Sequence, residues 1–233
     1  MTQIAGVDGC PGGWLCITLD SETDAVTANI FPTARQLLAF NPHIEAMAID
    51  MPIGLPHSGR RRCDKLAKNA LGNRHVCVFY APTRDALSSP SRIAASTILG
   101  RGATVQEWEI YSKINNLDLA LTSSHQRWCF EVHPEICFWA WNDATAMEHK
   151  KSSAEGRQAR EQLIDAHWPH HRANVLQELS GNEQIATNHY ADDDVNDAFA
   201  CLWTAQRLIA QNAERMPPDP DVDVRGLRME IWY

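Results

Sequence analysis

The chain has 233 residues, 44% of them hydrophobic and eight of them tryptophan, which is enough for the core of one domain. Its net charge of −8 at pH 7 argues against a uniformly basic nucleic-acid-binding protein, and no apolar run reaches the roughly 18 residues of a membrane helix. Seven scattered cysteines without a CxxC pair argue against a disulfide framework or a zinc site, and the first residues do not resemble a secretion signal, so we expect a cytoplasmic protein.

In the first part of the chain, short apolar segments separated by turns predict mainly β-strands. Three strands joined as a meander are expected at 3–8, 14–19 and 26–31. Thr33 is a suitable N-cap for a helix that runs to Phe40. An apolar strand at 46–49 follows and ends in a single acid, Asp50.

The remainder is mostly helical, with Gly and Pro at the element ends. The expected elements are a helix at 61–72 closed by Gly72, a helix at 106–115, a strand at 128–133 stopped by Pro134, helical segments at 155–180 and 192–213, and a terminal strand at 227–233. Residues 75–104 carry loop signals and have no clear assignment, and 217–220 suits a linker or an extended loop.

Three meandering strands followed by alternating helices and strands predict an α/β protein with a mixed sheet and helices on its faces. This is the order of a ribonuclease H-like fold, with five strands flanked by helices in a single domain over 1–233. A helical insertion at roughly 57–125 is expected after the fourth strand. The sequence leaves open whether this insertion caps the edge of the sheet or flanks it.

Two acids follow apolar strands at positions where a carboxylate does not help to form a hydrophobic core. Asp8 ends the strand that contains Ile4–Val7, and Asp50 ends the strand at 46–49. If these strands are parallel neighbours, both acids lie at the carboxyl edge of the sheet, where open α/β sheets bind ligands. Each Asp alone could instead be a turn former or a helix cap. Two on neighbouring strands favour a functional site.

The helix predicted at 192–213 begins with a run of acids. At 100° per residue, Asp194 and Asp197 lie at the edge of its apolar stripe, where they can reach the edge of the sheet. Asp192 and Asp193 suit the positive end of the helix dipole, and this alternative accounts for them well. It accounts poorly for Asp197.

A further acid and a histidine occur on the strand at 128–133. Alternation places Glu131 and His133 on one face, opposite Phe130 and Val132. The two could form a buried hydrogen-bonded pair or belong to an active site, and the sequence favours neither. Glu135 is more simply the acidic first turn of a helix.

Convergent carboxylates repel one another unless a cation separates them. Hard divalent cations take oxygen ligands, so the pattern predicts Mg²⁺ or Mn²⁺ as the cofactor. Asp8 and Asp50 are expected to bind a first ion, and Asp194 and Asp197 to complete a second site.

Positive charge is concentrated in one segment. Residues 60–101 hold nine Lys and Arg against two acids. Within this segment Arg62, Lys65 and Arg84 are candidates for contacts with phosphate. The alternative is an ordinary solvated helix face, which charge alone favours.

With these residues in view, the chain resembles the family catalogued as domain of unknown function 429, predicted ribonuclease H-like nucleases. The matching blocks run nearly end to end: GVDGCPGGW (6–14), AIDMPIGLP (48–56), RRCDKLAKNALGNRHVCVFYAPTR (61–84), QEWEIYSKINNLD (106–118), EVHPEICFW (131–139), DDVNDA (193–198) and GLRMEIWY (226–233). Cys77 stands where the family usually has serine, and the polar segment 143–155 is a candidate insertion.

The resemblance implies roles for particular residues. Asp8, Asp50, Asp194 and Asp197 occupy positions where the ribonuclease H-like superfamily, including Holliday-junction resolvases, carries its metal-binding acids. The family blocks add Arg62, Asp64, Arg84, Gln106, Lys113 and Glu131 as expected pocket residues.

Three hypotheses follow. The first is a metal-dependent phosphodiester hydrolase, a nuclease whose partner is DNA or RNA. The second is a small-molecule enzyme that processes a nucleotide or phosphate with the same acids. The third is a non-catalytic binding module. No membrane partner is expected, and the sequence does not indicate the oligomeric state.

Overall fold

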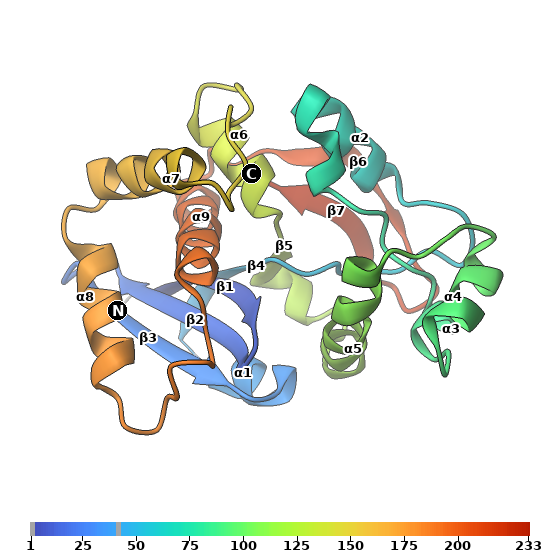
Figure 1. Ribbon diagram of the computed structural model, residues 1–233, viewed down its shortest axis with the longest axis horizontal. Helices are drawn as coiled ribbons and strands as arrows, with labels where there is room; N and C mark the ends of the chain where they lie inside the picture. The colour runs from blue at the N-terminus through green and yellow to red at the C-terminus, as the bar shows by residue number, and fades with distance from the viewer. Residues whose placement is uncertain (1–2, 41–42) are drawn as a thin grey trace.

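A five-stranded mixed sheet forms the centre of the protein, as described by a computed structural model that covers residues 3–40 and 43–233. Its strands are β1 (Gln3–Cys10), β2 (Gly13–Asp20), β3 (Ala25–Phe31), β4 (Ile44–Ile49) and β5 (Cys129–Glu131). The strand order is β3-β2-β1-β4-β5, with β1 to β3 antiparallel and both β4 and β5 parallel to β1 (Figure 1). The predicted meander and mixed sheet are therefore confirmed.

Helices cover both faces of this sheet, and β1, β2 and β4 are therefore buried on both sides. One core includes α9 (Asp192–Ile209), α6 (Pro134–Trp141), α7 (Ala154–His167) and α8 (His171–Gly181). The other includes α1 (Ala34–Ala39), whose N-cap is Thr33 as predicted, and α5 (Val105–Ala120). The two cores give the sheet a layer of helices on each face.

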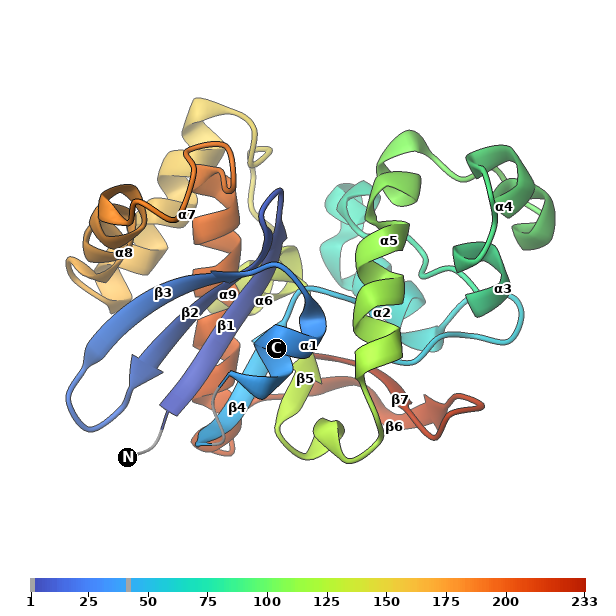
Figure 2. The ribbon, with the colours of Figure 1, turned by 90° about the horizontal axis from the view of Figure 1, so that it is seen from below.

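A helical lobe stands beside the sheet (Figure 2). It is built from the chain between β4 and β5, which also contains α5, and its other helices are α2 (Arg62–Leu71), η1 (Gly72–Cys77), α3 (Arg84–Leu87), α4 (Arg92–Leu99) and η2 (His125–Arg127). Gly72 ends α2 with a φ of 52°, as the sequence predicted. A separate two-stranded sheet of β6 (Arg215–Val222) and β7 (Arg228–Trp232) lies along this lobe.

Several boundaries differ from the sequence prediction. The helix expected at 155–180 is two helices, because Pro169 interrupts the pattern between α7 and α8. Residues 217–220 belong to β6, and the terminal strand pairs with β6 in its own sheet. The strand expected at 128–133 ends at Glu131, since α6 begins at Pro134. Of the expected helices, that at 106–115 extends from Val105 to Ala120, and that at 192–213 ends at Ile209.

Helix α9 packs directly on β1 at Gly6. A Cβ atom at Gly6 would lie 2.1 Å from the carbonyl oxygen of Ala198 and 2.3 Å from the amide nitrogen of Leu202. Only glycine permits this approach of helix to strand. The N-terminal turns of α9 are thereby held against the carboxyl end of β1.

Among residues 3–40 and 43–233, no helix is both long enough and apolar enough to cross a lipid bilayer.

Candidate active site

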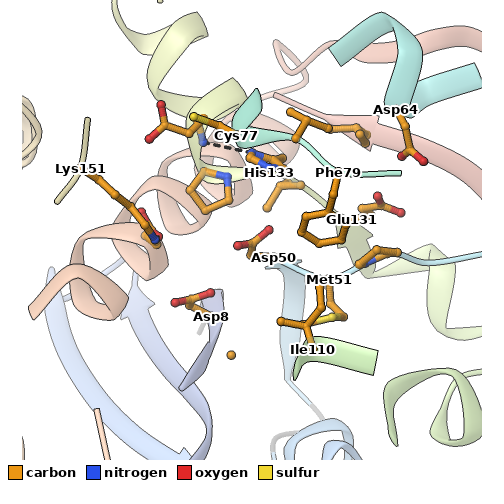
Figure 3. Close-up of a pocket in the computed structure, with 18 of the residues that line it drawn as sticks. Asp8, Asp50, Met51, Asp64, Cys77, Phe79, Ile110, Glu131, His133 and Lys151 are labelled. Atoms are coloured by element: carbon orange, nitrogen blue, oxygen red, sulfur yellow. Dashed lines mark hydrogen bonds and ion pairs between the residues drawn. The ribbon is translucent and has the colours of Figure 1, made fainter. Parts of the chain in front are cut away.

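Asp8 and Asp50 lie side by side at the carboxyl edge of the sheet. Val7 of β1 pairs with Ile49 of β4 in parallel register, and the amide of Asp50 donates to the carbonyl oxygen of Val7 at 2.9 Å. Alternation along each strand directs both acids to the face covered by α9, where Ala48 is also buried. Figure 3 shows the two carboxyl groups close together. The parallel register predicted from sequence thus brings them to one place.

Two acids from the first turns of α9 join this pair. Asp194 accepts a hydrogen bond from the amide of Ala191 at 2.8 Å, and Asp197, one turn further, is 4% exposed. Asp8, Asp50, Asp194 and Asp197 line one cavity of about 440 Å³. Asp192, which the sequence assigned to the helix dipole, is exposed and does not line it.

Burial raises the pKa of every carboxyl group in this cluster, and repulsion from other members adds to it at Asp8 and Asp197. The pKa of Asp8 lies well above its ordinary value because of burial and the nearby charges of Asp50, Asp197 and Asp194. Burial raises the pKa of Asp50, although His133 and Lys151 oppose it, and Asp8 donates a hydrogen bond to it. The pKa of Asp194 is raised mainly by burial, and that of Asp197 reaches about 6. Without a cation the cluster therefore holds its protons to a higher pH than free carboxyl groups do.

Lys151 brings a positive charge to the acids from the segment between α6 and α7. Its Nζ lies 2.6 Å from Oδ2 of Asp197 and 3.5 Å from Oδ2 of Asp193. Burial works against the ammonium group, but the charge of Asp197 and those of Asp8 and Asp193 outweigh it and raise the pKa of Lys151. Figure 3 shows the lysine directed toward Asp50 and Asp8. No motif or periodicity in the sequence singles out this residue.

The donor chemistry of the cluster fits a hard divalent cation, since all four groups supply carboxylate oxygens. As they stand, no three His, Cys, Asp or Glu side chains within the described ranges are arranged to hold an ion. Lys151 instead takes one oxygen of Asp197, and Asp8 is hydrogen-bonded to Asp50. Binding an ion would require these contacts to rearrange.

Glu131 belongs to a buried ionic network on the opposite face of the sheet. Arg61 donates to Glu131 at 2.7 and 2.6 Å and to Asp64 at 2.5 Å, and all three residues are at most 4% exposed. Glu131 also accepts from the amide of Ile53 at 2.6 Å, and Asp64 accepts from that of Ala81 at 3.0 Å. The network joins β5, α2 and the chain after β4, and it borders the same cavity.

His133 lies beside Asp50 and caps α6. Its Nδ1 accepts a hydrogen bond from the amide of Glu135 at 3.2 Å, so Nε2 carries the proton in the neutral ring. Glu135 is bound to the buried Arg160 of α7 at 2.5 Å and lies 3.6 Å from Arg74. His133 and Glu131 therefore have separate partners, although both line the cavity.

The structure does not bring all predicted basic residues to the site. Lys113 lines the cavity, and its ammonium group donates to the carbonyl oxygens of Cys10 and Gly13 at 2.6 and 2.9 Å. Arg84 is paired with Asp118 and Asp223, and Arg62 with Asp219 and Asp221. Lys65 and Gln106 are exposed, and none of Arg62, Lys65, Arg84 and Gln106 lines the cavity.

The cavity is also lined by residues that the sequence analysis did not single out. They are mainly Arg61, Arg74, Phe79, Lys150 and Lys151. Arg61 is adjacent to the predicted Arg62, and the family block at 61–84 contains Arg74 and Phe79, so this block was the available signal. Lys150 and Lys151 come from the polar segment 143–155, which carries no comparable signal. Cys77 also lines the cavity, and burial raises the pKa of its thiol.

Comparison with known proteins identifies the family. A sequence profile for "Protein of unknown function (DUF429)" matches residues 6–222, from β1 to the end of β6. The chain belongs to the DUF429 family. The matched region contains all four clustered acids and Lys151. The description of DUF429 names no activity, and no curated protein or solved structure matches the chain.

Proposed function

We propose that this DUF429 protein is a ribonuclease H-like, metal-dependent phosphodiester hydrolase, most simply a nuclease. The strand order β3-β2-β1-β4-β5, with three antiparallel strands followed by two parallel ones, supports the fold assignment. In that assignment the helices between β4 and β5 form an insertion. The acids at the ends of β1 and β4 and at the start of α9 occupy the sheet edge where such a fold carries its chemistry.

One observation carries the proposal: four carboxyl groups from three distant segments line a single cavity. Acids whose pKa values are all raised and that gather at one cavity, two of them buried and two half-buried, are typical of a functional site. Asp8 and Asp50 would hold a first Mg²⁺ or Mn²⁺, and Asp194 and Asp197 a second. A bound ion would stabilise negative charge that develops on a phosphate and lower the pKa of water.

The side chains around the acids have roles that follow from their contacts. Lys151 supplies a cation that can shift from Asp197 to a phosphate oxygen, because its side chain is 44% exposed. His133 lies near Asp50, and its Nε2–H can donate a hydrogen bond to a ligand in the cavity. Arg61 is fully engaged by Glu131 and Asp64 and holds the cavity wall in place.

The test is a cleavage assay with labelled substrates in Mg²⁺ or Mn²⁺. The panel contains single strands, duplexes, RNA–DNA hybrids, branched junctions and mononucleotides, and each is also incubated with Asp8→Asn and with EDTA. We expect cleavage of at least one polymer, lost with the variant and with EDTA. Metal-independent cleavage, or cleavage that Asp8→Asn retains, would contradict the proposal.

A second candidate is a small-molecule enzyme that hydrolyses a nucleotide or phosphate ester at the same acids. The cavity favours it, because about 440 Å³ lies in the range of small-ligand sites and the helical lobe walls one side. Turnover of a mononucleotide with no cleavage of any polymer would select this candidate. If no substrate in the panel is cleaved or turned over, and metal does not raise the melting temperature, the non-catalytic binding module is the remaining hypothesis.

A further inference from the structure

The cavity has two unlike walls. The four clustered acids line the wall made by the sheet and α9. The helical lobe and the chain after β4 supply an apolar wall opposite, formed by Met51, Val76, Val78, Phe79 and Ile110. A ligand that fills both sides needs one group that binds cations and one flat or apolar group.

Phe79 is the aromatic residue of this apolar wall. It follows η1, is half-buried, and its ring projects into the cavity between Asp50 and Glu131 (Figure 3). Within the described part of the chain it belongs to none of the three core clusters and to no ring pair, unlike its neighbours Val78 and Ile110. The core therefore does not account for this ring.

The backbone on both sides of Phe79 is fixed by charged side chains. Lys68 donates to the carbonyl oxygen of Val78, and Arg101 donates to that of Tyr80 at 3.1 Å. The amide of Ala81 donates to Asp64, which Arg61 holds in the buried network. The ring is thus presented on a rigid segment rather than on a free loop, as a preorganised contact requires.

We propose that Phe79 is the stacking surface for the base of one unpaired nucleotide unit, whose phosphate group faces the clustered acids. Aromatic rings bind bases of any sequence by stacking, and a base is the flat apolar group of a nucleotide. A base already stacked and paired within a duplex cannot also stack on a ring inside the cavity. The substrate class is therefore a single strand, a flipped nucleotide or a free nucleotide. The phosphate side of this inference rests on the proposed function, whereas the base side rests on Phe79.

Binding can be measured without cleavage by using the Asp8→Asn protein as background. The probes are a short single strand carrying 2-aminopurine and the corresponding 2-aminopurine nucleoside monophosphate, since stacking quenches the fluorescence of this base. We expect quenching by the Asp8→Asn protein, weakening of binding by about 5- to 150-fold when Phe79→Leu is added, and retention with Phe79→Trp. Ile93→Ala, an exposed apolar residue of α4 that does not line the cavity, is the control and should leave affinity within about twofold.

A second arm uses the wild-type protein on single strands that lack the base at one position. We expect cleavage beside the abasic unit to fall by a similar factor, and a fully paired duplex to be a poor substrate. Equal binding by Phe79→Leu together with efficient duplex cleavage would overturn the inference and leave the nuclease proposal standing. Phe79-dependent quenching without cleavage of any substrate would support the inference and count against the nuclease proposal. Circular dichroism of each variant checks that it is folded.

Discussion

The Nζ atom of Lys151 lies 2.6 Å from Oδ2 of Asp197, in the midst of three other acids that line the same cavity. Arg160 of α7 holds the segment that carries the lysine, since it donates to the carbonyl oxygen of His149 at 3.4 Å as well as to Glu135 of α6 at 2.5 Å. In the absence of a metal ion, the ammonium group partly neutralises the cluster. A divalent ion bound as we propose would therefore compete with Lys151 for Asp197.

This competition predicts that Lys151→Met binds Mn²⁺ more tightly than the wild type. The variant removes a positive charge beside the ion and frees Asp197, so we expect affinity to rise roughly tenfold at about pH 8. Isothermal titration calorimetry measures it directly. Lys150→Met is the matched control, because Lys150 lines the same cavity one residue away. Equal affinity of wild type and Lys151→Met would show that the lysine does not oppose the ion.

The raised pKa of Asp8 predicts that Asp8→Asn is more stable than the wild type without metal. A folded state with a raised carboxyl pKa binds more protons than the unfolded state, so stability is lost as pH rises through the folded pKa. Asparagine does not ionise and avoids this loss. At about pH 8 in EDTA we expect a melting temperature at least roughly 2–4 °C higher, the shift that 1 kcal/mol gives in a domain of this size.

The same comparison at about pH 5 serves as its control. Because its pKa is raised, Asp8 keeps its proton in the folded state to a greater extent at this lower pH, and the difference between the two proteins should shrink. A variant that is less stable than the wild type by the same amount at both pH values would contradict the electrostatic account of Asp8.

The position of the acids was predictable, whereas most of their neighbours were not. Asp8 and Asp50 follow from the ends of two apolar strands, and Asp197 from helical phase, and both patterns are local in the sequence. Lys151 depends on the path of a long polar segment, and Arg84 on pairing with Asp118 and with Asp223, which lies 139 residues away. Such long-range charge pairs leave no periodic pattern. The same limit explains why Arg62 was selected and its neighbour Arg61 was not.

Substitution of Arg61 should lower the free energy of unfolding much more than substitution of Arg62. Arg61→Leu leaves Glu131 and Asp64 buried without their partner, and we expect a loss of about 3–5 kcal/mol in the free energy of unfolding. Arg62→Leu removes pairs with exposed acids, where Asp219 is 86% exposed, and should cost less than about 1 kcal/mol. Urea unfolding of both variants tests this. Similar losses for the two would refute the assignment of the buried network to Arg61.

Gly6 should tolerate no side chain, because α9 packs against it. A Cβ atom there would lie 2.1 Å from a backbone oxygen of the helix, so Gly6→Ala must displace α9 and with it Asp194 and Asp197. We expect a loss of about 1–3 kcal/mol in stability together with weaker Mn²⁺ binding. Gly102→Ala, where a Cβ meets nothing within 4 Å, should leave both unchanged. Unchanged Mn²⁺ binding by a folded Gly6→Ala protein would contradict the placement of the α9 acids.

The most direct test that the cavity acids carry out metal-dependent cleavage compares Asp194→Asn with Asp192→Asn under single-turnover conditions. Both lie in the first turn of α9, but only Asp194 lines the cavity, and asparagine can keep its hydrogen bond to the amide of Ala191. The measurement is the rate of Mn²⁺-dependent cleavage of the best substrate from the panel. We expect the cleavage rate to fall by at least about 100-fold for Asp194→Asn and to stay near the wild-type rate for Asp192→Asn. Equal rates for the two variants would contradict this expectation.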